Sequence, residues 1–109
     1  SAADPNVPEQ KHLAWQPSQE AIELAVAEDY RVDVTQLFMK RVKQNKARIA
    51  ALYLIRKLTN ITVAELARQY GGVRQAAISK TVQRAEIRRA EQRPWRLRLV
   101  QIEKSLRQR

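Results

Sequence analysis

The side chains best suited to chemistry follow two adjacent glycines in the second half of the chain. Arg74 and Gln75 come soon after this pair, and Ala76, Ser79 and Gln83 follow at helical spacing. Arginine can bind guanine O6 and N7, glutamine can bind adenine N6 and N7, and a small alanine can lie against a thymine methyl group. These five residues are predicted to read base edges, with a phosphate contact for Arg74 and a helix-end cap for Gln75 as the alternatives.

Cationic and polar side chains around this group are suited to binding phosphates. Residues 40–48 hold five cations in nine positions, and a basic loop can follow a phosphate backbone or place an arginine in a minor groove. A further helix is predicted to begin at Thr62, where free backbone N–H groups favour the binding of an anion. The predicted phosphate-binding residues are Lys40, Arg41, Lys43, Lys46, Arg48, Thr62, Lys80 and Arg84.

The composition of the chain excludes most enzyme classes. Among its 109 residues there is no cysteine and one histidine, His12, so neither a thiolate site nor a His-paired base can be assembled. A stretch without charges or prolines is at most as long as residues 49–55, far shorter than the ~18 apolar residues of a membrane span. We therefore expect no enzymatic activity, no cofactor, no metal and no membrane partner in this chain, and a cytoplasmic, nucleoid-associated location.

The charge is unevenly distributed along the chain. Residues 1–36 hold two basic and seven acidic residues, and residues 37–109 hold nineteen basic and four acidic residues, which gives formal charges of −5 and +15. A split of this size favours attraction of a polyanion to the C-terminal two thirds. A merely solubilising basic surface is the alternative.

The elements that must position these side chains are all predicted to be helices. Residues 1–17, which hold three of the four prolines, are predicted to be a flexible arm or linker before a helical DNA-binding domain over residues 18–109. Ser18 is suited to cap a first helix, Asp33 a short second helix that ends near residue 39, and a largely apolar third helix is expected over about residues 46–59. The expected fold is an all-α bundle of five to six helices.

A helix-turn-helix is predicted over residues 62–85. Thr62 and Glu65 form a capping box, and the glycine pair ends that helix because glycine readily takes positive φ. Ile78, Val82 and Ala85 then recur on the inward face of a second helix whose outer face is polar and basic. An ordinary αα-hairpin is the alternative.

A last helix carries an apolar stripe that is suited to packing. The stripe is predicted to belong to the core, although it could equally hold a partner in a homodimer. Five arginines around it could extend a basic patch or merely solvate the helix. The stripe consists of Trp95, Leu99, Ile102 and Leu106, and the arginines are Arg88, Arg89, Arg93, Arg96 and Arg98.

A Tyr-Leu-Ile-Arg-Lys-Leu-Thr run begins at Tyr53, and a Glu-Leu-Ala-Arg-Gln-Tyr-Gly-Gly run begins at Glu65. Together they resemble the C-terminal duplex-DNA-binding domain of the bacterial replication initiator DnaA, over roughly residues 18–88. The resemblance implies an all-helical fold related to the Trp repressor, with an extended helix-turn-helix. After the glycines, however, that family has Arg-Asp-His-Thr-Thr-Val, whereas this chain has Val-Arg-Gln-Ala-Ala-Ile from Val73, so preference for an origin box is not expected.

The run from Gly72 to Arg84, with the leucines of the last helix, is similar to the DnaA-like C-terminal domain of single-tyrosine HUH-type (REP-associated) transposases. The resemblance implies an N-terminal catalytic domain in a longer parent protein, and this chain has nothing of that domain's histidine motif. Double-stranded DNA is the expected partner. An RNA or single-strand binder and a protein-interaction module acting through the last helix are the alternatives.

Overall fold

The computed structural model describes residues 15–109. The first fourteen residues of the predicted arm, with His12, lie outside this range. The described part confirms the all-α prediction, because it contains five α-helices and one short 3-10 helix. In chain order they are α2 (Gln19–Tyr30), η1 (Val34–Phe38), α3 (Lys46–Leu58), α4 (Val63–Gln69), α5 (Gln75–Glu91) and α6 (Arg93–Arg107).

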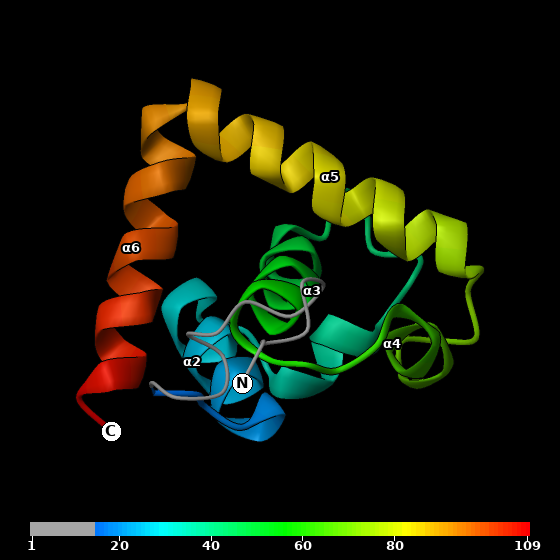
Figure 1. The fold of residues 1–109 in the computed structure, drawn as a ribbon, viewed down its shortest axis with the longest axis horizontal. Coiled ribbons are helices and arrows are strands. Elements are labelled where there is room, and N and C mark those ends of the chain that lie inside the picture. Colours follow the sequence, from blue (N-terminus) through cyan, green and yellow to red (C-terminus); the bar gives the residue numbers. More distant parts are fainter. Residues whose placement is uncertain (1–14) are drawn as a thin grey trace, which may run out of the picture.

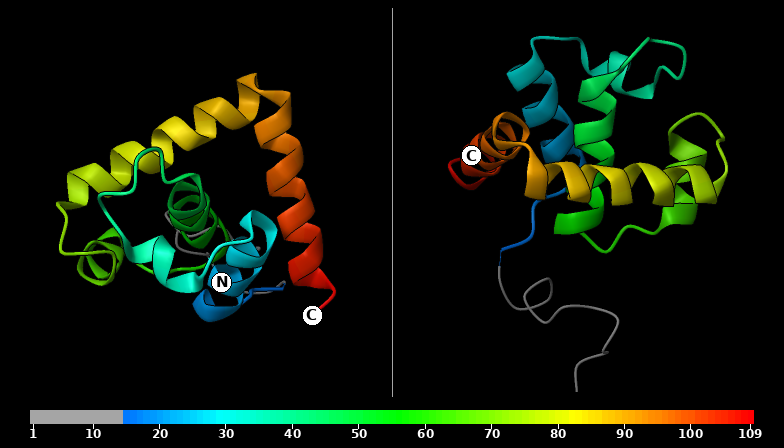
Figure 2. Two further views of the ribbon diagram at one scale, coloured as in Figure 1. Left: turned by 180° about the vertical axis from the view of Figure 1, so that it is seen from behind. Right: turned by 90° about the horizontal axis from the view of Figure 1, so that it is seen from above.

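Helix α3 lies at the centre of the molecule, with α2, α4, α5 and α6 around it (Figure 1). Its residues from Ala50 to Ile55 are all buried, as expected for a helix that is apolar on most sides. Helix α5 crosses over α3, and α6 turns sharply away from its end and returns past α2 (Figures 1 and 2). The two long C-terminal helices, α5 and α6, therefore border the core on two sides (Figure 1).

The helix starts follow from local capping. The Ser18 hydroxyl accepts a hydrogen bond from Ala21 N, and the Thr62 hydroxyl accepts one from Glu65 N, both at 3.1 Å. Asp33 caps η1 through Thr35 N at 2.9 Å, and the helix that follows is 3-10 rather than α. Short 3-10 helices are common in connections between longer elements.

The chain turns between α4 and α5 at the two glycines. Gly71 has a φ of 98° and Gly72 a φ of 67°, a conformation that residues with a Cβ rarely adopt. Ile78 and Ala85 of α5 are then buried and Val82 is half-buried, as predicted. The pair of helices and its glycine turn are thus present, with α5 extending to Glu91.

The stripe on α6 packs inside the chain. Trp95, Leu99, Ile102 and Leu106 are each at most 5% exposed, and the Trp95 indole N–H donates to the Ala85 carbonyl at 3.0 Å. The prediction of a core stripe is confirmed, and the same side chains are not available to a second copy, because α2 and α5 already cover them. Within residues 15–109 no helix is long and apolar enough to cross a membrane.

Candidate nucleic-acid interface

The five predicted base-reading residues share the exposed side of the first half of α5. Arg74 is the N-cap residue of the helix, and Gln75, Ala76, Ser79 and Gln83 are all exposed. Within the described residues no side chain caps the start of α5, so Gln75 is not used as a cap. The side chains that could contact base edges are therefore presented together on a single helix.

A shallow hollow lies beside the start of α5, with a volume of about 460 Å³. Small apolar side chains and two cations contribute to its lining. An apolar surface of this kind suits a methyl group better than a polar one. The hollow is lined by Gly72, Val73, Arg74, Ala76, Ala77 and Lys80.

A second hollow of about 250 Å³ lies on the other flank of α5. It is lined by Ser79 and Gln83 from α5, by Val63 at the start of α4, and by Arg56 of α3. Thr62, the exposed N-cap residue of α4, therefore stands next to the exposed face of α5. The structure brings the predicted threonine and the predicted base-reading residues to one surface.

The basic loop, residues 39–45, is closed at its base by Asn45. The Asn45 amide donates to the carbonyls of Gln36 and Met39 at 2.8 and 3.0 Å, and its oxygen accepts from Arg48 N at 3.2 Å. Because Asn45 is buried, these bonds are protected from water. The expected flexible loop is therefore anchored at its base, and it presents Arg41 and Lys43 at its exposed tip.

Lys40 joins this loop to the turn between α4 and α5. Its Nζ donates to the Gly71 carbonyl at 2.9 Å, and a Cβ added to Gly71 would come within 2.8 Å of the Lys40 side chain. The loop and the turn are 31 residues apart in sequence but directly in contact. Lys40 therefore holds the basic loop beside the start of α5.

Arg48 was predicted to contact phosphate, but its side chain is used inside the protein. Its guanidinium donates to the carbonyls of Leu37 and Tyr70 at 3.2 and 2.7 Å and lies 5.4 Å from the centre of the Tyr70 ring. Partial burial lowers the pKa of Arg48. These contacts correct the prediction for this residue, which positions the turn because its donors are directed at backbone carbonyls.

Tyr70 and Glu23 also support the turn between α4 and α5, and neither role was predicted from the sequence. The Tyr70 hydroxyl donates to the Glu23 carboxylate at 2.7 Å, and the Tyr70 ring packs against Phe38 at 4.6 Å. Burial raises the pKa of Tyr70, and Glu23 raises it further by hydrogen bonding and by its charge. The only signal in the sequence was a glutamate next to Ile22 on the apolar side of the first helix.

The ion pairs of the described residues are unevenly distributed over the surface. In the described part of the chain the ion pairs are Arg89–Glu103, Arg98–Asp29, Arg109–Glu28 and Lys57–Glu86. None of them involves the basic loop, the glycine turn or the first half of α5. Besides Arg48, whose donors are directed at backbone carbonyls, the cations in or next to these regions with no carboxylate among residues 15–109 within ion-pair distance are Lys40, Arg41, Lys43, Lys46, Arg74, Lys80 and Arg84.

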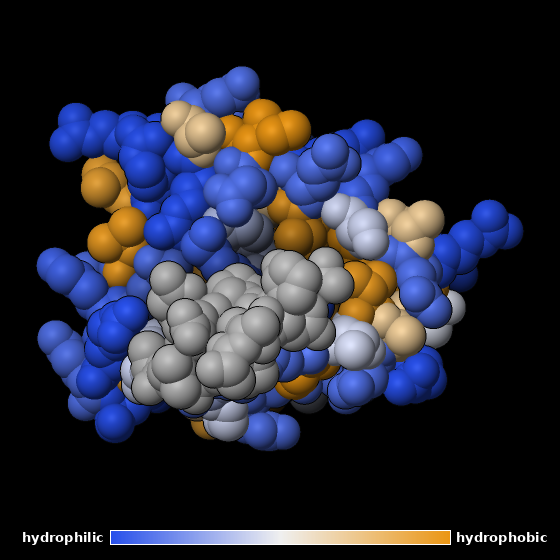
Figure 3. All heavy atoms as spheres, in the orientation of Figure 1, coloured by the Kyte–Doolittle hydropathy of each residue, from blue (hydrophilic) through white to orange (hydrophobic). Residues whose placement is uncertain are grey.

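Most of the C-terminal arginines make contacts within the protein. Arg89 forms two hydrogen bonds with Glu103, at 3.0 and 3.1 Å, and Arg96 donates to the last carbonyls of α5. Arg98 bonds Asp29 and lies 3.7 Å from the centre of the Tyr30 ring. Hydrophilic side chains still dominate the visible surface over α5 and α6 (Figure 3). Much of this positive charge is compensated or committed to packing.

In comparisons with known proteins, no family model matches the chain and no curated protein matches its sequence. The resemblance to the initiator and transposase domains therefore stays a prediction that rests on the quoted residues.

Proposed function

We propose that the chain binds double-stranded DNA through α4 and α5, used as a helix-turn-helix. The observation that carries the proposal is the set of seven cations without carboxylate partners in residues 15–109, gathered around the exposed polar face of α5. Phosphates can neutralise these cations without breaking an ion pair of the folded protein. A duplex-binding protein of this kind would be associated with the nucleoid.

The two parts of the surface suit different parts of a duplex. The first turns of α5 expose Arg74 and Gln75, whose side chains match the donor and acceptor pattern of the major groove. The basic loop is held beside them by Lys40 and is suited to the backbone or to a minor groove. Base reading is thus assigned to α5 and affinity to the cations around it.

A salt titration tests the proposal. If about five phosphates are neutralised, log Kobs against log salt concentration should fall with a slope of about −4 to −5. Double-stranded DNA should bind more tightly than single-stranded DNA of the same length. A slope near zero would contradict the proposal, and equal binding of the single strand would favour the alternative of a single-strand or RNA binder.

The parent protein is proposed from the sequence resemblance alone. A transposase or an initiator-like protein would use such a domain to bring a catalytic or ATPase domain to a chosen site. The residues that read the origin box in the initiator family are replaced here, so a competition assay should show no preference for an origin box over other duplexes. A strong preference would indicate that the basic loop reads that site.

A further inference from the structure

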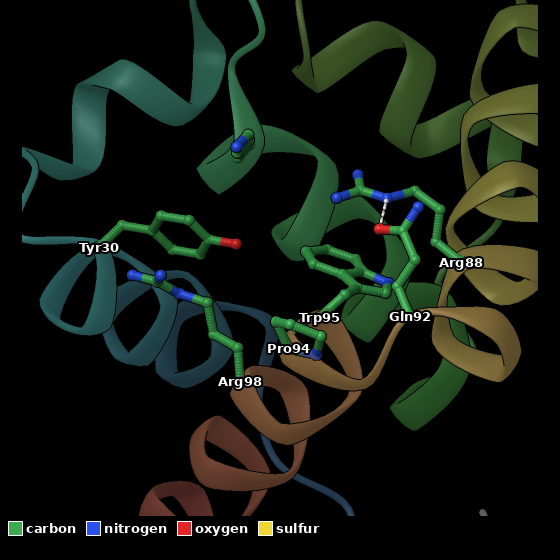
Figure 4. A pocket seen from close by; sticks show the side chains of 7 residues that line it. Tyr30, Arg88, Gln92, Pro94, Trp95 and Arg98 are labelled. Atoms are coloured by element: carbon green, nitrogen blue, oxygen red, sulfur yellow. Dashed lines mark hydrogen bonds between the residues drawn. The ribbon is translucent and has the colours of Figure 1, made fainter.

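A pocket of about 250 Å³ lies where the chain turns from α5 into α6 (Figure 4). Three cations line it from three different helices: Lys46 begins α3, Arg88 lies near the end of α5, and Arg98 lies in α6. No carboxylate is among the lining residues of the described chain. Asp29 pairs with Arg98, so the described charges around the pocket leave a positive excess.

Both arginines are held in place by aromatic rings. The Arg88 guanidinium lies 4.5 Å from the centre of the Trp95 ring, and its Nε donates to the Gln92 side chain at 3.4 Å. Within residues 15–109 its terminal nitrogens make no hydrogen bond, and Lys46 forms no ion pair. A stacked guanidinium loses little further freedom when it binds an anion, so these groups are preorganised for one.

The pocket lies on the same side of the molecule as the basic loop. Seen from behind, the loop is drawn between the glycine turn at one end of α5 and the corner with α6 at the other (Figure 2). Lys40 contacts the turn, and Lys46, which follows the loop, lines the pocket. Lys40 and Lys46 therefore place positive charge near both ends of α5.

The distance along α5 matches several base pairs of DNA. From Gln75 to Arg88 the helix rises by about 20 Å at 1.5 Å per residue. One DNA strand carries a phosphate about every 3.4 Å of duplex axis, so this length corresponds to about six base pairs. If α5 runs along the duplex with its start in the major groove, a strand that passes the basic loop would therefore reach the pocket about six nucleotides further on.

We infer that this pocket binds a phosphate group and that the phosphate belongs to the backbone of the bound duplex, beyond the helix-turn-helix. The inference rests on the proposed function. The arginine fork and the lysine supply charge-assisted donors of the kind that phosphate oxygens accept. A free phosphate compound would have the same chemistry, so the experiment must separate the two sources.

The first measurement compares Lys46→Gln and Arg88→Gln with Arg93→Gln, an exposed arginine at the same corner that does not line the pocket. Each pocket variant should reduce the magnitude of the salt slope by about 0.9, so that the gain in affinity from 1 M to 0.1 M salt is about eightfold smaller than for the wild-type chain. Arg93→Gln should leave the slope unchanged. The inference is overturned if the pocket variants behave like this control.

Lys46→Gln guards against a folding artefact, because the exposed Lys46 side chain forms no ion pair within residues 15–109. A duplex scanned with single uncharged methylphosphonate linkages then locates the contact. One linkage should weaken binding of the wild-type chain but have no further effect on Lys46→Gln. The linkage whose effect is lost in Lys46→Gln should differ from the linkages whose effects are lost when Lys80 or Arg84 is replaced.

The second measurement follows the Trp95 indole N–H by NMR while inorganic phosphate or a mononucleotide is added. A saturable shift that disappears in Arg88→Gln, and that free phosphate can no longer produce once the chain is saturated with duplex DNA, supports the inference. A phosphate shift that still develops in the duplex-saturated chain would assign the pocket to a free phosphate compound and overturn the DNA source. If the wild-type chain bound no duplex, the proposed function would fail, and a missing phosphate shift would separately exclude the pocket.

Discussion

The basic residues around the start of α5 and those around α6 are of the same types but are used differently. Around α5 and the basic loop, seven cations have no carboxylate among residues 15–109 within ion-pair distance. Around α6, Arg89, Arg98 and Arg109 pair with Glu103, Asp29 and Glu28. The first region is suited to an external polyanion, whereas in the second region three arginines are paired with carboxylates and help to hold the helices together.

The reason for the difference is the position of the acidic part of the chain. Helix α2, which belongs to the acidic N-terminal third, packs beside α6 and places Glu28 and Asp29 within reach of its arginines. The charge split along the sequence therefore overstates the charge available near α6. No such compensation is found among the described residues at the basic loop, the glycine turn and the first half of α5.

The largest expected effect is on stability, in the paired region. Arg89→Met keeps the aliphatic stem but leaves Glu103, whose side chain is 20% exposed, without its two charged hydrogen bonds. We expect the free energy of unfolding to fall by about 2–3 kcal/mol, as measured by urea denaturation, with DNA affinity at a fixed salt concentration nearly unchanged.

Lys57→Met is the matched control. Its pair with Glu86 is 3.5 Å long, and both side chains are well exposed, so the loss should stay below about 0.5 kcal/mol. If Arg89→Met weakened DNA binding as much as it weakened the fold, the division between the two regions would be wrong.

The next largest effect is on sequence choice in the open region. Gln75→Ala removes an exposed amide at the start of α5, where a lost base contact should cost about 1.5 kcal/mol of discrimination. A selection from random duplexes should therefore yield a different motif for this variant. Because the side chain is exposed, stability should change by no more than about 0.5 kcal/mol.

A smaller effect is expected from Lys43→Ala at the tip of the basic loop. All sequences should be bound more weakly, and the magnitude of the salt slope should fall by about one, while the selected motif stays the same. Lys104→Ala, an exposed lysine of α6, is the control and should leave the slope unchanged. A changed motif with Lys43→Ala but not with Gln75→Ala would move recognition from α5 to the loop.

The smallest expected effect tests whether the hollow beside Ala76 binds a thymine methyl group. Replacing thymine by uracil in the preferred site, one position at a time, removes one methyl group and no hydrogen bond. At one position we expect a loss of about 0.8 kcal/mol, the free energy of burying one such group, which is roughly a fourfold change in affinity. Equal affinity at every position would show that no methyl group occupies the hollow.

The features that the sequence determined by itself are local ones. Ser18 and Thr62 cap helices three residues from their partners, the two glycines permit a turn with positive φ, and Ile78 and Ala85 mark the buried side of α5. Each depends on a few neighbouring residues and on the 3.6-residue period of a helix. The all-helical fold, the core stripe of α6 and the exposed face of α5 could therefore be predicted.

Only the tertiary structure decided which cations are open to a partner. Arg48 bonds the Tyr70 carbonyl 22 residues away, Tyr70 bonds Glu23 across 47 residues, and Arg98 bonds Asp29 across 69. Such contacts depend on how helices pack, which no local pattern encodes. A guanidinium close to a carboxylate or a carbonyl is already satisfied, whereas the same group without such a neighbour remains a donor for a phosphate.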